Sequence, residues 1–187
     1  MKMDRAANYK IVFTGPVGAG KTTAIAALSD VPPITTDELA TDMTQERKPT
    51  TTVALDYGLM KLADDQRIHL YGTPGQERFD FMWEILVEGG IGLVLLLDGS
   101  RPAPHKDMLF FLDAFRDFIA STSVVIGVTR TDLAPDLSLD VLHDHLRRTG
   151  LNPPVFTVDA RERDDVRTLV KALLYAIDPG LSDDAAL

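Results

Sequence analysis

The sequence predicts an α/β fold in which a mostly parallel six-stranded sheet has helices on both faces and includes one antiparallel hairpin strand. Short runs rich in Val, Ile and Leu recur along the chain, and unbroken apolar runs of this length are typical of parallel strands buried on both faces. These runs are residues 10–14, 91–98, 124–129 and 155–158. Stretches with helical periodicity separate them, which is the pattern of strand and helix units that builds a parallel sheet.

The other elements follow from local patterns. Residues 52–60 and 66–72 alternate between apolar and polar side chains across a short connection, so we expect an antiparallel hairpin. Five stretches are expected to be helical: 21–29, 79–87, 104–120, 138–148 and 164–177. Pro135 and the segment 150–154 interrupt the helical pattern.

Length and composition favour one domain. A chain of 187 residues with 45% hydrophobic content can bury one good core and is too short for two ordinary ones. We expect a single domain over residues 10–178, preceded by a flexible N-terminus at 1–9 and followed by a tail at 179–187. The absence of cysteine excludes disulfides and thiolate metal sites.

Net charge and hydropathy limit the classes of binding partner and the cellular location that we expect. A formal net charge of −9 argues against general binding to nucleic acid or anionic membranes. The longest apolar run, 91–97, has the length of a strand, and the first ten residues lack the apolar stretch of a secretory signal. We therefore expect a cytoplasmic protein with no membrane insertion.

The stretch "FTGPVGAGKTT", residues 13–23, carries the most specific motif. It fits the pattern GxxxxGK[ST] of a phosphate-binding loop, and it stands between a predicted strand and a predicted helix, as that motif requires. In such a loop, backbone N–H groups and the helix N-terminus face the phosphates, the lysine reaches the outer phosphates and the hydroxyl binds magnesium. The predicted fold is therefore that of a P-loop NTPase, with Lys21 and Thr22 in these two roles.

A long polar segment separates the first helix from the hairpin. Residues 31–51 are rich in threonine, and connections of this length inside compact domains are usually functional or disordered. Two interpretations stay open, a mobile loop that responds to ligand and a plain solvated connection. Within it, Arg47 could act as an internal arginine finger on the γ-phosphate, or form a solvated charge pair with Lys48.

The stretch "YGTPGQERF", residues 71–79, resembles the "DTAGQERF" stretch of Ras, Rab and Arf-like small GTPases. Together with the phosphate loop it makes the chain similar to their bacterial relatives of the MglA and conservon type, over roughly residues 10–177. "TVALDY", residues 52–57, is similar to the "TIGVDF" of Rab proteins. That similarity nominates Thr52 as the first switch threonine, with Thr51 as the alternative register.

The resemblance implies a role for each matching residue. Lys21 and the N–H groups of the loop would hold the phosphates, Thr22 and Thr52 would bind magnesium, and the Gly75 N–H would meet the γ-phosphate. Gln76 would orient the attacking water, so Gln76, Lys21 and Arg47 are the candidate catalytic residues. The phosphate contacts would come from Gly15, Pro16, Val17, Gly18, Ala19, Gly20, Lys21, Thr22 and Thr23.

The chain departs from the family pattern near the metal. Gly72 stands where the family has an aspartate that supports magnesium, and Pro74 replaces the usual alanine. Asp56 and Asp98 are the available carboxylates. Asp98 ends an apolar run in the manner of the Walker-B acid of other P-loop ATPases, so it supports a competing ATPase interpretation.

The base would be read after the strand at 124–129. "VTRTD", residues 128–132, stands where the family has Asn-Lys-x-Asp, so Asp132 remains while Thr129 and Arg130 replace the asparagine and lysine. A carboxylate accepts two N–H bonds from guanine and none of that pattern from adenine, which favours guanine. "VDARE", residues 158–162, resembles the Ser-Ala-Lys loop of the family. It would place Asp159, Ala160 and Arg161 beside the base.

These observations lead to one expected function. We expect a small GTPase that binds GTP and GDP with magnesium, hydrolyses GTP slowly and acts as a switch. The resemblance implies a GTPase-activating or effector partner, in the bacterial relatives often a roadblock-domain protein. Phe81 points off the apolar stripe of the helix at 79–87 and is the candidate contact. The alternatives are a nucleotide-binding scaffold with weak catalysis and an ATP-using P-loop enzyme.

Overall fold

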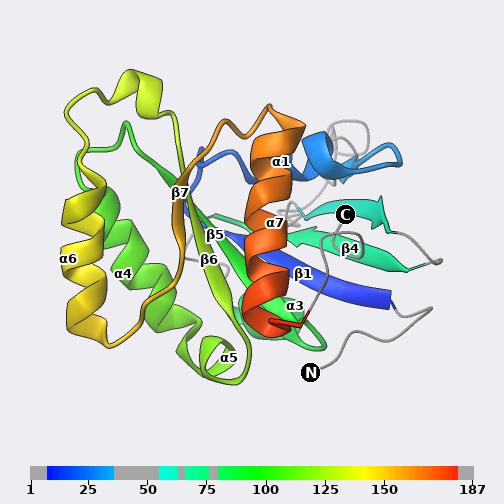
Figure 1. Ribbon diagram of the computed structural model, residues 1–187. Coiled ribbons are helices and arrows are strands. Elements are labelled where there is room, and N and C mark those ends of the chain that lie inside the picture. Colours follow the sequence, from blue (N-terminus) through cyan, green and yellow to red (C-terminus); the bar gives the residue numbers. More distant parts are fainter. Residues whose placement is uncertain (1–7, 36–54, 63–65, 76–79, 181–187) are drawn as a thin grey trace, which may run out of the picture.

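The computed structural model describes residues 8–35, 55–62, 66–75 and 80–180 (Figure 1). One sheet of seven strands, ordered β2-β3-β4-β1-β5-β6-β7, forms the middle of the protein. Its strands are β1 (Asn8–Thr14), β2 (Ile34–Thr35), β3 (Asp56–Lys61), β4 (Arg67–Gly72), β5 (Gly92–Asp98), β6 (Val124–Thr129) and β7 (Val155–Thr157).

The sheet confirms the predicted fold class. Strands β4, β1, β5, β6 and β7 are parallel neighbours, and β3 pairs with β4 as the antiparallel strand of the expected hairpin. All six predicted strands are present. The seventh, β2, has two residues and pairs antiparallel with Asp56 and Tyr57 of β3. It lies in the segment 31–51, for which no strand was predicted. Two residues are too few to give a sequence pattern.

Helices cover both faces of the sheet. On one face, α1 (Lys21–Leu28) and α7 (Arg163–Ile177) lie against each other (Figure 1). The second face carries α3 (Phe81–Val87), α4 (Pro104–Ala114), α5 (Arg116–Ser121) and α6 (Leu139–Thr149). Successive strand residues point to opposite faces, so β1 places Ile11 and Phe13 in one core cluster and Val12 in the other.

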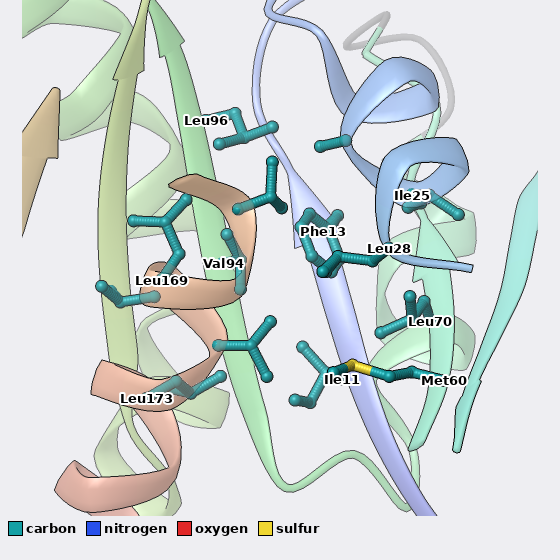
Figure 2. Close-up of a cluster of buried hydrophobic side chains, with 14 of the residues drawn as sticks. Ile11, Phe13, Ile25, Leu28, Met60, Leu70, Val94, Leu96, Leu169 and Leu173 are labelled. Carbon is teal, nitrogen blue, oxygen red and sulfur yellow. The ribbon is translucent and has the colours of Figure 1, made fainter. Parts of the chain in front are cut away.

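Two buried clusters hold these layers together. Figure 2 shows the first, in which Phe13 lies between Ile25 and Leu28 of α1 on one side and Val94 of β5 on the other. Leu173 of α7 belongs to the same cluster. Each fully buried side chain of this size stabilises the fold by about 1.5–3 kcal/mol relative to exposure. The sheet is therefore a rigid support for the loops at its ends.

The second face differs from expectation in one place. The single helix expected at 104–120 is two helices, because Phe115 leaves the helical conformation at φ −102 and ψ 18. The Phe115 ring is buried and stacks on Trp83 of α3, with ring centroids 5.2 Å apart. The tertiary contact thus overrides the local helical pattern. Phe81, on the opposite side of α3, is 61% exposed, as its position off the apolar stripe predicts.

Among the described helices, none combines the length and the apolar character needed to cross a membrane.

Candidate nucleotide-binding site

The phosphate loop joins β1 to α1 at the carboxyl end of the parallel strands, where ligands of open α/β sheets bind. Two of its glycines are required by geometry. Gly15 has φ 137, and a Cβ added to it would lie 2.0 Å from the Leu96 carbonyl oxygen of β5. Gly20 has φ 93, and a Cβ there would lie 3.0 Å from the Ala160 Cβ. These glycines let the loop backbone lie against β5 and against the loop that follows β7.

Lys21 points into the curve of this loop. Its Nζ donates hydrogen bonds to the carbonyl oxygens of Gly15 at 2.7 Å and Pro16 at 2.8 Å, and the residue is 7% exposed. Burial lowers the pKa of the Lys21 ammonium to about 8, against the opposing attraction of Asp56. An ammonium that has lost most of its water gains strongly from an anion, so this position suits the phosphates assigned to it.

Gly75 lies over the same loop. A Cβ added to Gly75 would lie 2.6 Å from the Val17 backbone nitrogen and 2.8 Å from Lys21 Nζ. The segment is held from the other side, because the Trp83 indole N–H donates to the Pro74 carbonyl oxygen at 3.1 Å. The structure therefore brings Gly75 to the phosphate loop, as the γ-phosphate role expected for its N–H group requires.

Asp56 supplies the carboxylate nearest to the phosphate-loop threonine. Thr22 Oγ1 donates to Asp56 Oδ2 at 2.6 Å. Asp56 pairs with Gly72 across the β3–β4 hairpin, and a Cβ added to Gly72 would lie 2.9 Å from Asp56 Cβ and 3.1 Å from its Oδ2. The Asp56 side chain thus fills the space that a side chain at position 72 would need. A hydroxyl and a carboxylate are the hard oxygen ligands that magnesium prefers, so the pair fits this metal.

The sequence named Asp56 and Asp98 as the available carboxylates, and the register of the hairpin separates them. The hairpin turn closes with the Leu62 N–H donating to the Gln66 carbonyl oxygen, which makes Lys61 and Arg67 the first pair. Counting outward from that turn places Asp56 opposite Gly72. Asp98 has other partners, since its Oδ2 accepts from Arg130 Nη1 at 2.9 Å.

A pocket of about 560 Å³ opens beside the phosphate loop. It is lined by the residues expected at the base, Thr129, Arg130, Asp132, Asp159, Ala160 and Arg161, together with Gly20 and Thr23 of the loop. Thr129 Oγ1 donates toward the carbonyl oxygens of Ala19 and Leu97, both at 3.1 Å. Thr129 therefore links the phosphate loop to the sheet by hydrogen bonds, and it does so at the position where the small GTPases have asparagine.

Two polar groups of this pocket are available to a ligand. Among the residues that the structure describes, Asp132 accepts no hydrogen bond and the Ala160 N–H makes none, although Asp132 attracts the nearby Arg161 electrostatically. The neighbouring N–H groups are used, since Asp159 donates to Asp165 Oδ2 at 2.8 Å and Arg161 to Asp159 Oδ1 at 2.9 Å. The side-chain pair with Arg161 lowers the pKa of Asp159 to about 2.

Residues 32–179 match a protein family described as conserved hypothetical ATP-binding protein. The chain belongs to this family. The match begins after the phosphate loop, so loop and family are independent indications of a P-loop nucleotide-binding protein.

Two curated proteins extend the comparison. An uncharacterised protein of Methanocaldococcus jannaschii is 33% identical over 107 residues, which are 57% of this chain and 60% of that protein. The Ras-related protein RABA6b of Arabidopsis thaliana is 28% identical over 127 residues, 67% of this chain and 51% of that protein. The chain therefore spans between half and two thirds of the length of these relatives. The family match and the match to the Ras-related protein together support membership in the P-loop GTPase-like superfamily. The assignment to the MglA and conservon branch stays a prediction.

Several predicted site residues lie outside the described part of the chain. These are Arg47, Thr51, Thr52 and Gln76, and their roles remain predictions. The described site residues come together from the ends of β1, β3, β4, β6 and β7. No group of three or more potential metal ligands occurs among the described residues.

Proposed function

We propose that this protein binds GTP and GDP with magnesium, hydrolyses GTP slowly and acts as a nucleotide-dependent switch. The observation that carries the base assignment is the pair of groups in the pocket, the Asp132 carboxylate and the Ala160 N–H, which have no hydrogen-bond partner among the described residues. Guanine offers two N–H donors on one edge and a carbonyl acceptor beside them. One acceptor and one donor on the protein match this pattern.

Adenine fits the same two groups less well. Its amino group stands where guanine has the carbonyl oxygen, so the Ala160 N–H would meet a donor, and its ring nitrogen would face the Asp132 carboxylate without a proton. A hydrogen bond to a charged group contributes about 1.5–3 kcal/mol, which corresponds to roughly a 10- to 150-fold preference for guanine. The family description names ATP, so adenine nucleotide binding is the second candidate.

Magnesium would be held by Thr22 and the switch threonine Thr52, with Asp56 as the supporting carboxylate. When bound, the ion neutralises charge on the phosphate oxygens. The support for this assignment is the 2.6 Å contact of Thr22 with Asp56 and the space that Gly72 leaves for the carboxylate.

The hydrolytic residues follow from the family resemblance. Gln76 would orient the attacking water, Lys21 would hold the outer phosphates, and Arg47 would stabilise the charge that develops on them. Slow hydrolysis without an activator is expected, because the resemblance implies a GTPase-activating or effector partner, which in the bacterial relatives is often a roadblock-domain protein. The exposed Phe81 on α3 lies close in sequence to Gln76 and would be part of that contact.

Competitive equilibrium titration tests the base. A fluorescent guanine nucleotide bound with magnesium is displaced by GTP, GDP or ATP, and Lys21→Ala serves as the variant without phosphate binding. We expect GTP and GDP to displace it at least tenfold better than ATP, and Asp132→Asn to remove most of this preference. Asp136→Asn is the matched control, since Asp136 follows in the same loop and does not line the pocket. Equal displacement by ATP would favour the ATP-using alternative.

Phosphate release under multiple turnover tests the switch. The proposal expects slow turnover of GTP that Gln76→Leu abolishes while nucleotide affinity stays unchanged. Arg47→Ala should slow hydrolysis far more than it weakens binding. Binding without turnover in the wild-type protein would instead support the weakly catalytic scaffold.

A further inference from the structure

A buried carboxylate holds the arginine of the base pocket. Arg130 Nη1 donates to Asp98 Oδ2 at 2.9 Å, and Asp98 is only 5% exposed. The other oxygen, Asp98 Oδ1, accepts from the backbone N–H of Ser100 at 2.9 Å and from its hydroxyl at 2.6 Å. Both carboxylate oxygens therefore have partners, and these contacts fix the direction in which Asp98 faces Arg130.

Arg130 lies where the phosphate loop meets the pocket. Its backbone is left-handed, at φ 54 and ψ 33, and among the described residues other than glycine it alone has positive φ. Its Nη1 is 3.9 Å from the position of a Cβ added to Gly18. The side chain is 50% exposed, although one end is held, and it lines the pocket. The exposed part of the guanidinium is therefore available to a ligand.

We propose that Asp98 is a positioning residue for the nucleotide base: it holds the Arg130 guanidinium so that its plane forms one wall of the base pocket. The inference rests on the proposed nucleotide binding, and it gives Asp98 a different role from the metal-supporting acid of the ATPase interpretation. A guanidinium plane attracts the face of an aromatic ring, and every base has such a face. This wall therefore strengthens the binding of any purine, while Asp132 and Ala160 choose between purines.

The contact with Asp98 strengthens base stacking because it fixes the Arg130 side chain before the nucleotide binds. A free arginine side chain must give up rotational freedom when a base stacks on it, whereas a side chain already fixed at one end gives up less. Loss of the Asp98 charge should thus weaken base binding through Arg130 alone. Contacts of the phosphates with the loop should be unaffected, because Asp98 makes no described contact with Lys21 or Thr22.

The test compares a nucleotide with a phosphate chain that lacks a base. Affinities for GDP, ADP and inorganic tripolyphosphate with magnesium are measured for the wild type, Asp98→Asn, Arg130→Ala and the double variant. We expect Arg130→Ala to weaken the preferred nucleoside diphosphate by about 5- to 100-fold. Asp98→Asn should weaken it by about 3- to 10-fold, and the double variant by no more than Arg130→Ala. Tripolyphosphate affinity should stay within about twofold of the wild type for all variants.

Two further variants sharpen the result. Asp30→Asn is the matched control, because it breaks an aspartate–arginine pair of 2.6 Å with Arg163, away from the pocket, and it should leave all affinities unchanged. Arg130→Lys leaves Asp98 intact and keeps the charge but removes the planar group, so it should weaken the nucleotide and spare tripolyphosphate.

The outcomes separate the two proposals. A wild-type protein that binds tripolyphosphate but no nucleotide would refute both the proposed function and the positioning role. Wild-type nucleotide binding that Asp98→Asn leaves unchanged would refute the positioning role alone. Equal loss of GDP and tripolyphosphate in Asp98→Asn, or additive losses in the double variant, would also overturn it, since Asp98 would then act on the whole site or independently of Arg130.

Discussion

Placing an aspartate at position 72, where the family resemblance expects one, should damage this protein. A side chain at Gly72 would begin 2.9 Å from Asp56 Cβ and 3.0 Å from Ile25 Cδ1, both closer than side-chain carbons normally approach. Overpacking of this kind costs about 1–3 kcal/mol, and two carboxylates in one place add repulsion. In a domain of this size each kcal/mol lowers the melting temperature by about 2–4 °C, so Gly72→Asp should melt about 2–12 °C lower.

Two further variants, Asp56→Ala and Asp56→Ala/Gly72→Asp, test whether a carboxylate at position 72 can replace the one at position 56. Asp56→Ala should retain the fold and lose most of the strengthening that magnesium gives to GDP binding. Asp56→Ala/Gly72→Asp should recover much of that strengthening. It should recover only part of the stability that Gly72→Asp loses, because the second carboxylate is gone but the close contacts with Ile25 and with the Cβ at position 56 remain. Thermal unfolding without nucleotide and GDP titration with and without magnesium measure the two effects. The reasoning is refuted if Gly72→Asp is as stable as the wild type, or if Asp56→Ala keeps its full magnesium dependence.

Three other predictions concern the phosphate loop. Thr129→Val removes a buried hydroxyl that faces the carbonyl oxygens of Ala19 and Leu97, so it should lower the free energy of unfolding in urea by about 1–3 kcal/mol. It should also weaken the binding of both tripolyphosphate and nucleotide. An unchanged tripolyphosphate affinity would contradict the inference that Thr129 holds the phosphate loop against the sheet. Gly15→Ala places a Cβ 2.0 Å from a strand carbonyl oxygen and should abolish nucleotide binding in the same titration, whereas retained binding would show that the loop can shift. The pKa of Lys21 is lowered to about 8 in the folded protein, so the nucleotide-free protein should become more stable as the pH rises from about 8 to 10.5. In this range the unfolded chain still binds a proton that folded Lys21 has released. Urea unfolding at pH 7.5 and 9.5 measures the gain, and Lys21→Met should lack it.

Local patterns in the sequence were sufficient to predict the sheet and the phosphate loop. Buried parallel strands need continuous apolar runs, and the motif at 13–23 requires a strand before it and a helix after it, so these predictions depended on neighbouring residues alone. The break at Phe115 could not be predicted in this way, because it depends on the stacking of that ring on Trp83 of another helix. The two-residue strand β2 is too short to leave a pattern.

Asp56 and Asp98 show why the site was only partly predictable. Both are carboxylates at strand ends, and residue type alone cannot distinguish them. The order of the sheet does, because β5 lies between β1 and β6 while β3 lies beyond β4. Asp98 at the end of β5 pairs in register with Thr129 and so reaches Arg130 on the base side. Asp56 at the start of β3 stands opposite Gly72 and reaches Thr22 on the phosphate side.

This division also bears on the choice between GTP and ATP. The ATPase interpretation needed Asp98 beside the metal, but its carboxylate is engaged by Arg130 and Ser100. The proposed base assignment therefore rests on two pocket groups without a described hydrogen-bond partner, the Asp132 carboxylate and the Ala160 N–H. Guanine would satisfy both, whereas adenine would offer the Asp132 carboxylate no N–H donor. These groups are the support for the guanine preference that we propose, within a family whose description names ATP.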